Sequence, residues 1–262
     1  MGVLSTYVVN EILDHILKTG SFSQPTNLYV ALFNGDPSGA GSECPGTEYA
    51  RQQVNAWDAA ASRATENTSQ IDFPEIETDD WGTIDYIAIY DADTGGNLIA
   101  YDAVDSYVTQ LGDNLYIGAG DLDISITSGG VTTAWANKIL DHIFKNTAIT
   151  VPTNLYVGVS TANPTDDASG LAEPSGGAYA RKNHNTWDSA ASKATENTGA
   201  ITFTQATASW GELTYGFISD SVDAVLEANI IFYGALGSSL LIGNQDTLNF
   251  ADGAIDIAVD AA

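Results

Sequence analysis

Hydrophobic residues recur at helical spacing near the start of the chain. Four of them follow each other at four-residue intervals: Leu4, Val8, Ile12 and Ile16. This spacing places them on one face of an amphipathic helix. Ser5 or Thr6 can cap its start, and Gly20 can end it. The pattern returns near the middle of the chain, where the apolar face is formed by Trp135, Ile139, Leu140, Ile143 and Phe144.

Most other apolar residues lie in short runs that are typical of strands. The clearest runs are residues 28–33, 84–90, 98–101, 122–126 and 255–260. The first two end in turn signals, and residues 91–97 between the second and third run predict a hairpin. Many short strands separated by turns are typical of sandwiches and jelly rolls. We therefore predict an all-β fold of two tandem β-sandwich or jelly-roll-like domains, each opened by one amphipathic helix.

The chain contains one sequence twice. Four motifs recur 127 to 130 residues apart: ILDHI at 12–16 and 139–143, PTNLYV at 25–30 and 152–157, YAR at 49–51 and 179–181, and ATENT at 64–68 and 194–198. The drift in spacing indicates short insertions and deletions in loops. A period this long indicates tandem domains rather than a solenoid. We expect domains at 1–127 and 128–262, joined by the small-residue linker 127–130.

Net charge narrows the range of functions. The chain has 34 acidic and 8 basic residues, a formal net charge of −26 and a pI near 4.1. Such a chain repels phosphate backbones and anionic lipids, so we expect neither nucleic-acid nor membrane binding. The composition fits a protein that works in high salt, where ions screen self-repulsion, although an acidic protein in ordinary buffer is the open alternative. The lone cysteine, Cys44, excludes an intrachain disulfide and a cysteine-based zinc site.

No strong catalytic motif is present. His15 and His142 are repeat equivalents, each beside an aspartate, and we expect packing or interface positions for both because adjacent helix residues do not face each other. His184 has no equivalent histidine in the first repeat. Glu66 and Glu196 recur inside the ATENT motif, where a local hydrogen-bonding role is expected. We predict a protein without enzymatic activity and without a cofactor.

One loop has the oxygen-rich pattern of a cation site. Asp91, Asp93 and Asn97 alternate as calcium ligands do, but the closing glutamate of an EF-hand is missing. The second repeat breaks the spacing. We keep these three residues as weak cation candidates and a plain β-turn as the alternative.

Four residues are candidates for interfaces. Arg51 and Arg181 are equivalent, lie near aromatic residues, and suit either an ion pair inside the domain or a contact between subunits. Tyr7 and Trp135 lie on the opening helices, where an exposed aromatic side chain would serve docking.

Six aromatic positions recur in both repeats, and we predict that they form the cores, with sugar binding by exposed aromatics as the alternative. They are Tyr29/Tyr156, Tyr49/Tyr179, Trp57/Trp187, Phe73/Phe203, Trp81/Trp210 and Tyr86/Tyr215.

Taken together, the repeated motifs are specific. ILDHI, PTNLYV, the segment 173–181 (EPSGGAYAR) and Trp210-Gly211 resemble a family of small tail-fibre-like virion proteins of tailed viruses, which are usually single copies of this repeat. The resemblance covers nearly the whole chain in two copies. It implies membership of a virus particle and no catalytic residues, and the acidic composition points to a halophilic host.

The expected function is that of a non-enzymatic virion structural protein. Our leading hypothesis is a capsid decoration or turret protein, and the alternatives are a tail-fibre or baseplate adhesin and a carbohydrate-binding module. The expected partners are the major capsid or tail proteins and further copies of the chain. A glycan or protein on the host surface is a further candidate partner, and the expected localisation is the virion.

Overall fold

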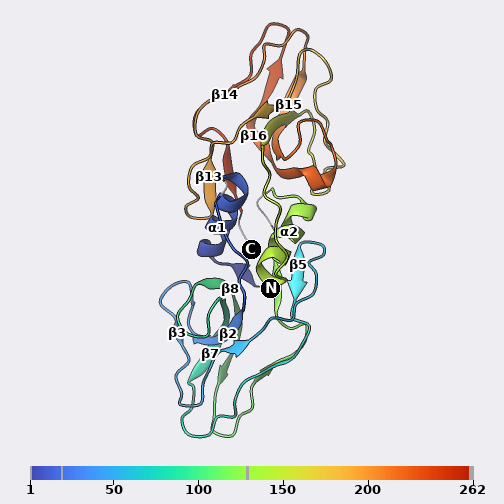
Figure 1. Cartoon of the computed structure of the whole chain (residues 1–262). Coiled ribbons are helices and arrows are strands. Elements are labelled where there is room, and N and C mark those ends of the chain that lie inside the picture. Colours follow the sequence, from blue (N-terminus) through green and yellow to red (C-terminus); the bar gives the residue numbers. More distant parts are fainter. Residues whose placement is uncertain (1, 19, 128–129, 260–262) are drawn as a thin grey trace.

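The computed structural model describes residues 2–18, 20–127 and 130–259. Figure 1 shows the two repeats at opposite ends of an elongated molecule, with their opening helices next to each other between them. These helices are α1 (Thr6–Leu17) and α2 (Thr133–Phe144). Neither is long and apolar enough to cross a bilayer, and the same holds for every helix in the described part of the chain.

Each repeat is built on one antiparallel sheet. In repeat 1 the strand order is β1-β8-β7-β2-β3, and β4 also pairs with β2. The strands are β1 (Val3–Leu4), β2 (Tyr29–Asn34), β3 (Ser42–Glu43), β4 (Gln52–Gln53), β7 (Thr83–Tyr90) and β8 (Leu98–Val108). In repeat 2 the order is β12-β11-β15-β16, from β11 (Tyr156–Ser160), β12 (Lys182–Asn183), β15 (Gly211–Ser219) and β16 (Ile230–Ile242).

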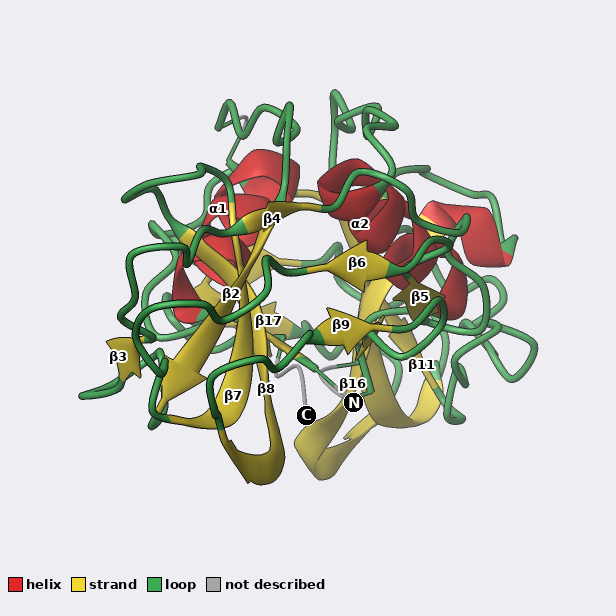
Figure 2. Cartoon of the chain, turned by 90° about the horizontal axis from the view of Figure 1, so that it is seen from below, coloured by secondary structure: helices red, strands yellow, loops and turns green. Residues whose placement is uncertain are grey.

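Short two-stranded ladders complete each repeat. In repeat 1, β5 (Ala64–Glu66) pairs with β10 (Asp123–Ser125), and β6 (Ile71–Asp72) pairs with β9 (Tyr116–Ile117). Repeat 2 has the same ladders in β13 (Ala194–Glu196) with β18 (Asp256–Ala258), and β14 (Ile201–Thr202) with β17 (Asn249–Phe250). The 3₁₀ helix η1 (Glu227–Asn229) precedes β16. Figure 2, seen from below, shows the two main sheets on either side of the centre.

The helix caps differ between the repeats although their sequences are similar. Ser5 caps α1, and its hydroxyl accepts a hydrogen bond from the amide of Val8 at 3.2 Å. Thr132 occupies the N-cap of α2 without a side-chain cap bond, and its hydroxyl donates to the carbonyl of Ile230 at 2.7 Å. The hydroxyl of Ser5 likewise donates to the carbonyl of Leu98, so each cap residue ties its helix to a strand of its own repeat, β8 or β16.

The two repeats share one hydrophobic core. A single cluster of buried residues includes the apolar faces of both helices and the inner faces of both main sheets. Trp57 of repeat 1 packs on Phe144 of α2, with ring centroids 4.7 Å apart. Burial of this shared apolar surface stabilises each repeat through the other.

The all-β prediction is confirmed, with differences in detail. The hairpin at 91–97 is present, but the third strand run extends to Val108 because the continuation of β8 pairs with β7. The strand orders do not confirm the jelly-roll detail. The predicted strand end at Asp260 and residues 128–129 of the expected linker lie outside the described residues.

Candidate interaction surfaces

The contact between the repeats is reciprocal. Asp14 of α1 accepts a hydrogen bond from the amide of Ala190 at 2.8 Å, and Asp141 of α2 accepts one from the amide of Ala60 at 2.7 Å. The two pairs are repeat equivalents with the repeats exchanged. A contact in which each half supplies the same donor and the same acceptor is isologous, as in a two-fold symmetric dimer. The tandem chain is thus a covalent form of such a dimer.

A second pair of bonds repeats this symmetry. Asn10 accepts from the amide of Lys193 at 2.9 Å, and Asn137 accepts from the amide of Arg63 at 2.8 Å. Both donors lie in two-residue turns whose backbones adopt positive φ, 71° at Arg63 and 67° at Lys193. Residues other than glycine rarely adopt this backbone conformation, which costs about 1–3 kcal/mol. An asparagine of each helix therefore binds a strained turn of the opposite repeat.

The two helix histidines meet at the centre of this contact. The rings of His15 and His142 stack with centroids 5.1 Å apart. His142 Nδ1 accepts from the amide of Ile149, which leaves its proton on Nε2, and Nε2 lies 3.1 Å from the carbonyl oxygen of Phe22. Burial lowers the pKa of His142, and the neighbouring His15 lowers it further. The expected packing or interface role of both histidines is confirmed.

Sequence analysis missed Arg63, which holds the junction between the repeats. Its guanidinium donates to the carbonyl of Ile126 and to the carbonyl of Val131, both at 2.7 Å. These carbonyls lie on either side of residues 127–130. Arg63 also approaches Asp166 of repeat 2 at 3.4 Å. The sequence feature that could have identified it is a basic residue, rare in this chain, directly before the repeated ATENT motif, and we interpreted that motif only as a turn.

Arg51 and Arg181 form ion pairs inside their own repeats. Arg51 pairs with Glu43 at 2.8 Å, and Arg181 pairs with Glu173. The guanidinium of Arg51 lies 3.8 Å from the ring centre of Tyr90, as expected for a scarce arginine beside aromatics. Of the two alternatives, the ion pair inside the domain is confirmed. The glutamates are repeat equivalents that the motif search overlooked.

Arg51 also binds backbone oxygen atoms of the candidate cation loop. Arg51 donates to the carbonyls of Ala92 at 2.9 Å and Gly95 at 2.7 Å. The carboxylate of Asp91 accepts from the amide of Asn97 at 2.6 Å and from its side chain at 2.8 Å. A guanidinium bound to the loop repels a second cation. The β-turn alternative fits these contacts, and no metal-binding group of three or more side chains occurs among the described residues.

The two aromatic docking candidates have different environments. Trp135 is 1% exposed, and its indole donates to the carbonyl of Ala228 at 3.0 Å, so the prediction that it is exposed is wrong. The cause is the chain of repeat 2 before β16, which covers this helix face. Tyr7 is 36% exposed and packs edge-on against Phe22. An interface role for Tyr7 stays a prediction.

The repeated tryptophans and phenylalanines lie in the core. All five tryptophans of the chain are buried, and so are Phe73 and Phe203. The paired tyrosines are half-buried. Burial raises the pKa of Tyr49 and Tyr179, whose hydroxyls donate to Glu43 and Glu173. The core prediction is confirmed for the paired tryptophans and phenylalanines but not for the half-buried tyrosines, and no exposed tryptophan is left for a sugar-binding platform.

Comparison with known protein families gives a match that covers both repeats. A family model described as podophage GP4 fiber I protein gp80 matches residues 3–125 and again residues 130–258. The two matches cover the two repeats almost end to end. A search of characterised proteins found no match.

Proposed function

Because the chain belongs to the family of the podophage GP4 fiber I protein gp80, we propose that it is a structural subunit of a tail fibre and has no enzymatic activity. The family assigns the protein to the virion. Both repeats match the same family model, so one chain contains two copies of the family's domain.

The reciprocal contact between the repeats carries this proposal. Equivalent helix residues bind equivalent turns in both directions, at Asp14 and Asp141 and again at Asn10 and Asn137. Together with the shared core, these bonds make the chain a preassembled rigid two-fold unit. A fibre must transmit force along its length, and a unit whose halves share a core suits that task.

Copy number in the virion tests the location. Quantitative mass spectrometry of purified particles, normalised to the major capsid protein, is expected to give a few to tens of copies. Hundreds of copies would overturn the fibre proposal in favour of the capsid decoration that the sequence led us to expect. Absence from the particle would contradict both.

Antibody labelling provides an independent control. We expect gold particles on the tail in electron micrographs, with none above background on the capsid. Labelling on the capsid would contradict the proposal even at low copy number, and this includes labelling confined to a special vertex.

A further inference from the structure

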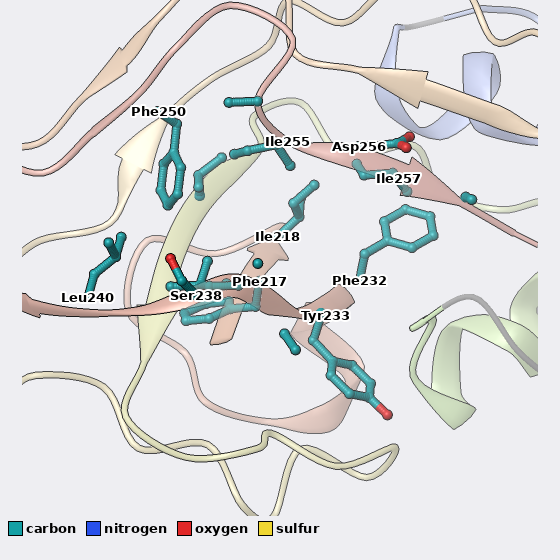
Figure 3. Close-up of a pocket in the computed structure, with 18 residues that line it drawn as sticks. Phe217, Ile218, Phe232, Tyr233, Ser238, Leu240, Phe250, Ile255, Asp256 and Ile257 are labelled. Atoms are coloured by element: carbon teal, nitrogen blue, oxygen red, sulfur yellow. The ribbon is translucent and has the colours of Figure 1, made fainter. Parts of the chain in front are cut away.

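Repeat 2 contains an open cavity of about 460 Å³. It lies between the outer part of β16 and the segment that runs through β17 and β18, as Figure 3 shows. Its wall is mostly apolar and includes Ile218, Phe232, Leu236, Leu240, Phe250 and Ile255. We call it the repeat-2 cavity. Its volume lies at the lower end of the range of about 300–1,000 Å³ typical of binding pockets.

The equivalent surface of repeat 1 carries more charge. The strand registers place Asp102 where repeat 2 has Gly234, since Ala103 faces Tyr86 as Ala235 faces Tyr215. Asp121 stands in the same way at the position of Ala254. Two carboxylates are thus absent from the repeat-2 cavity, and Asp256 is the one acid among its lining residues. In a chain of net charge −26, this wall is unusually neutral.

Repeat 1 instead exposes large apolar side chains. Four of them lie within one ten-residue segment and are 46–65% exposed: Tyr107, Val108, Leu111 and Tyr116. We call them the repeat-1 tip. The hydroxyl of Tyr107 donates to Asp113 at 2.9 Å, which holds the segment together. Val108 ends β8, roughly 20 Å beyond the residues that pair with β1, given a rise of about 3.3 Å per residue.

Two of the four tip residues have polar counterparts in repeat 2. The pairing of Tyr116 with Asp72 corresponds to that of Asn249 with Thr202, so repeat 2 has asparagine at this position. Asn244 likewise replaces Leu111, as the equivalent bonds of the neighbouring Asp113 and Asp246 show. The other two positions stay apolar, because Leu240 stands at the position of Tyr107 and Leu241, which is 74% exposed, at that of Val108. Repeat 1 therefore has the larger apolar projection, and repeat 2 has the neutral cavity.

We propose that the repeat-1 tip of one chain inserts into the repeat-2 cavity of a second copy. The two repeats are joined through their shared core and extend to opposite ends of the molecule, so a chain cannot fill its own cavity (Figure 1). Contact between two copies that each carry −26 charges requires a surface where few carboxylates face each other, and the cavity supplies it. A contact between two different surfaces leaves one of each free, so chains join head to tail, into a closed ring if the rotation between neighbours closes and into an open filament if it does not.

Each half of the contact can be removed with residues taken from the other repeat. The double variant Leu111→Asn with Tyr116→Asn gives the tip the residues of repeat 2. The double variant Gly234→Asp with Ala254→Asp gives the cavity the carboxylates of repeat 1. A side chain fits at Gly234, where an added Cβ meets nothing within 4 Å. Val222→Asp with Val225→Asp is the control, since it adds the same charge on an exposed apolar loop elsewhere.

Sedimentation velocity over a hundred-fold concentration range tests the proposal, in about 1 M NaCl to shorten the Debye length to about 3 Å. We expect the wild type and the control to associate, and each of the other two variants to raise the dissociation constant at least tenfold. An equimolar mixture of those two variants should form dimers and stop there, because one intact tip then meets one intact cavity. Unchanged melting temperatures would show that the variants fold.

Three results would overturn the proposal. They are a wild type that stays monomeric, a tip or cavity variant that assembles like the wild type, and a mixture that stays monomeric. Loss of association in the control would also contradict it, because apolar contact or charge alone would then explain the effect. The proposal does not depend on where the protein lies in the particle. A monomeric chain would leave the fibre assignment standing.

Discussion

At the scale of single residues, one dipeptide serves the contact between the repeats in two ways. Adjacent residues on a helix do not face each other, so the aspartate and the histidine of the ILDHI motif reach different partners. Asp141 binds a backbone amide of the opposite repeat, whereas His142 stacks on its own equivalent, His15. The motif is thus explained by an interface rather than by catalysis.

Loss of one of these carboxylates should weaken the fold. Asp141→Ala leaves the amide of Ala60 without its acceptor, and we expect a loss of about 1–3 kcal/mol in the free energy of unfolding. Asp14→Ala should cost a similar amount, because its bond to Ala190 is equivalent. Urea unfolding at constant salt measures both. Asp58→Ala is the exposed control and should change stability by less than about 0.5 kcal/mol.

The buried His142 predicts a dependence of stability on pH. The pKa of His142 is lowered from 6.5 in the folded protein, so the unfolded chain binds a proton first as the pH falls. Its contribution to stability is therefore complete above about pH 6.5 and is lost progressively below that value. Urea midpoints between pH 7.5 and 5.5 should decrease for the wild type and change less for His142→Asn. An equal slope in the variant would exclude this histidine as the cause.

At the scale of elements, a buried arginine ties the loop between two strands to a neighbouring segment in each repeat. Arg181 donates to the carbonyls of Ser221 at 2.8 Å and Ala224 at 3.0 Å, between β15 and β16. Arg51 does the same for the turn between β7 and β8. The conserved geometry in both repeats shows that the scarce arginines are structural.

The two arginines should differ in their effect on stability. The side chain of Arg181 is 1% exposed and that of Glu173 is 18% exposed, so Arg181→Ala leaves a carboxylate largely removed from water and should cost about 3 kcal/mol. Glu43 is 29% exposed, so Arg51→Ala should cost about 1–2 kcal/mol. Thermal unfolding of both variants measures the order. Lys182→Ala is the control, because it removes a hydrogen bond at the surface. A larger loss of stability for Arg51→Ala than for Arg181→Ala would contradict the burial argument.

At the scale of the whole molecule, electrostatic repulsion between the acidic residues opposes the stability that the shared core provides. With a net charge of −26, the exposed carboxylates repel one another, and salt screens exposed charges beyond about 10 Å at 0.1 M and about 3 Å at 1 M. The shared core must hold both repeats together against this repulsion. Adaptation to high salt stays a prediction from composition.

Stability should therefore rise with salt. We expect the urea midpoint to increase steadily from 0.1 M to molar NaCl. A variant with four exposed acids neutralised should start higher at low salt and rise less: Asp58→Asn, Glu75→Gln, Glu77→Gln and Asp105→Asn. Parallel curves for the variant and the wild type would show that salt acts through something other than charge screening, and a flat wild-type curve would remove the high-salt argument.

The sequence by itself determined the features that are local or repeated. Helical spacing located α1 and α2, strand runs and turn signals located β2, β7 and the hairpin at 91–97, and the recurring motifs showed the duplication. These patterns are readable because periodicity and turn chemistry act between residues close in the chain. The arginine ion pairs were foreseen as one alternative, but their partners Glu43 and Glu173 were not.

Only the tertiary structure decided how the repeats meet and which side chains remain exposed. The reciprocal contacts at Asp14 and Asp141, the role of Arg63 at the junction and the burial of Trp135 all join segments tens of residues apart. The repeat-2 cavity likewise depends on which positions of two distant strands face each other. Hydrophobic burial is non-directional, so a pattern shows that a residue packs but does not show against what.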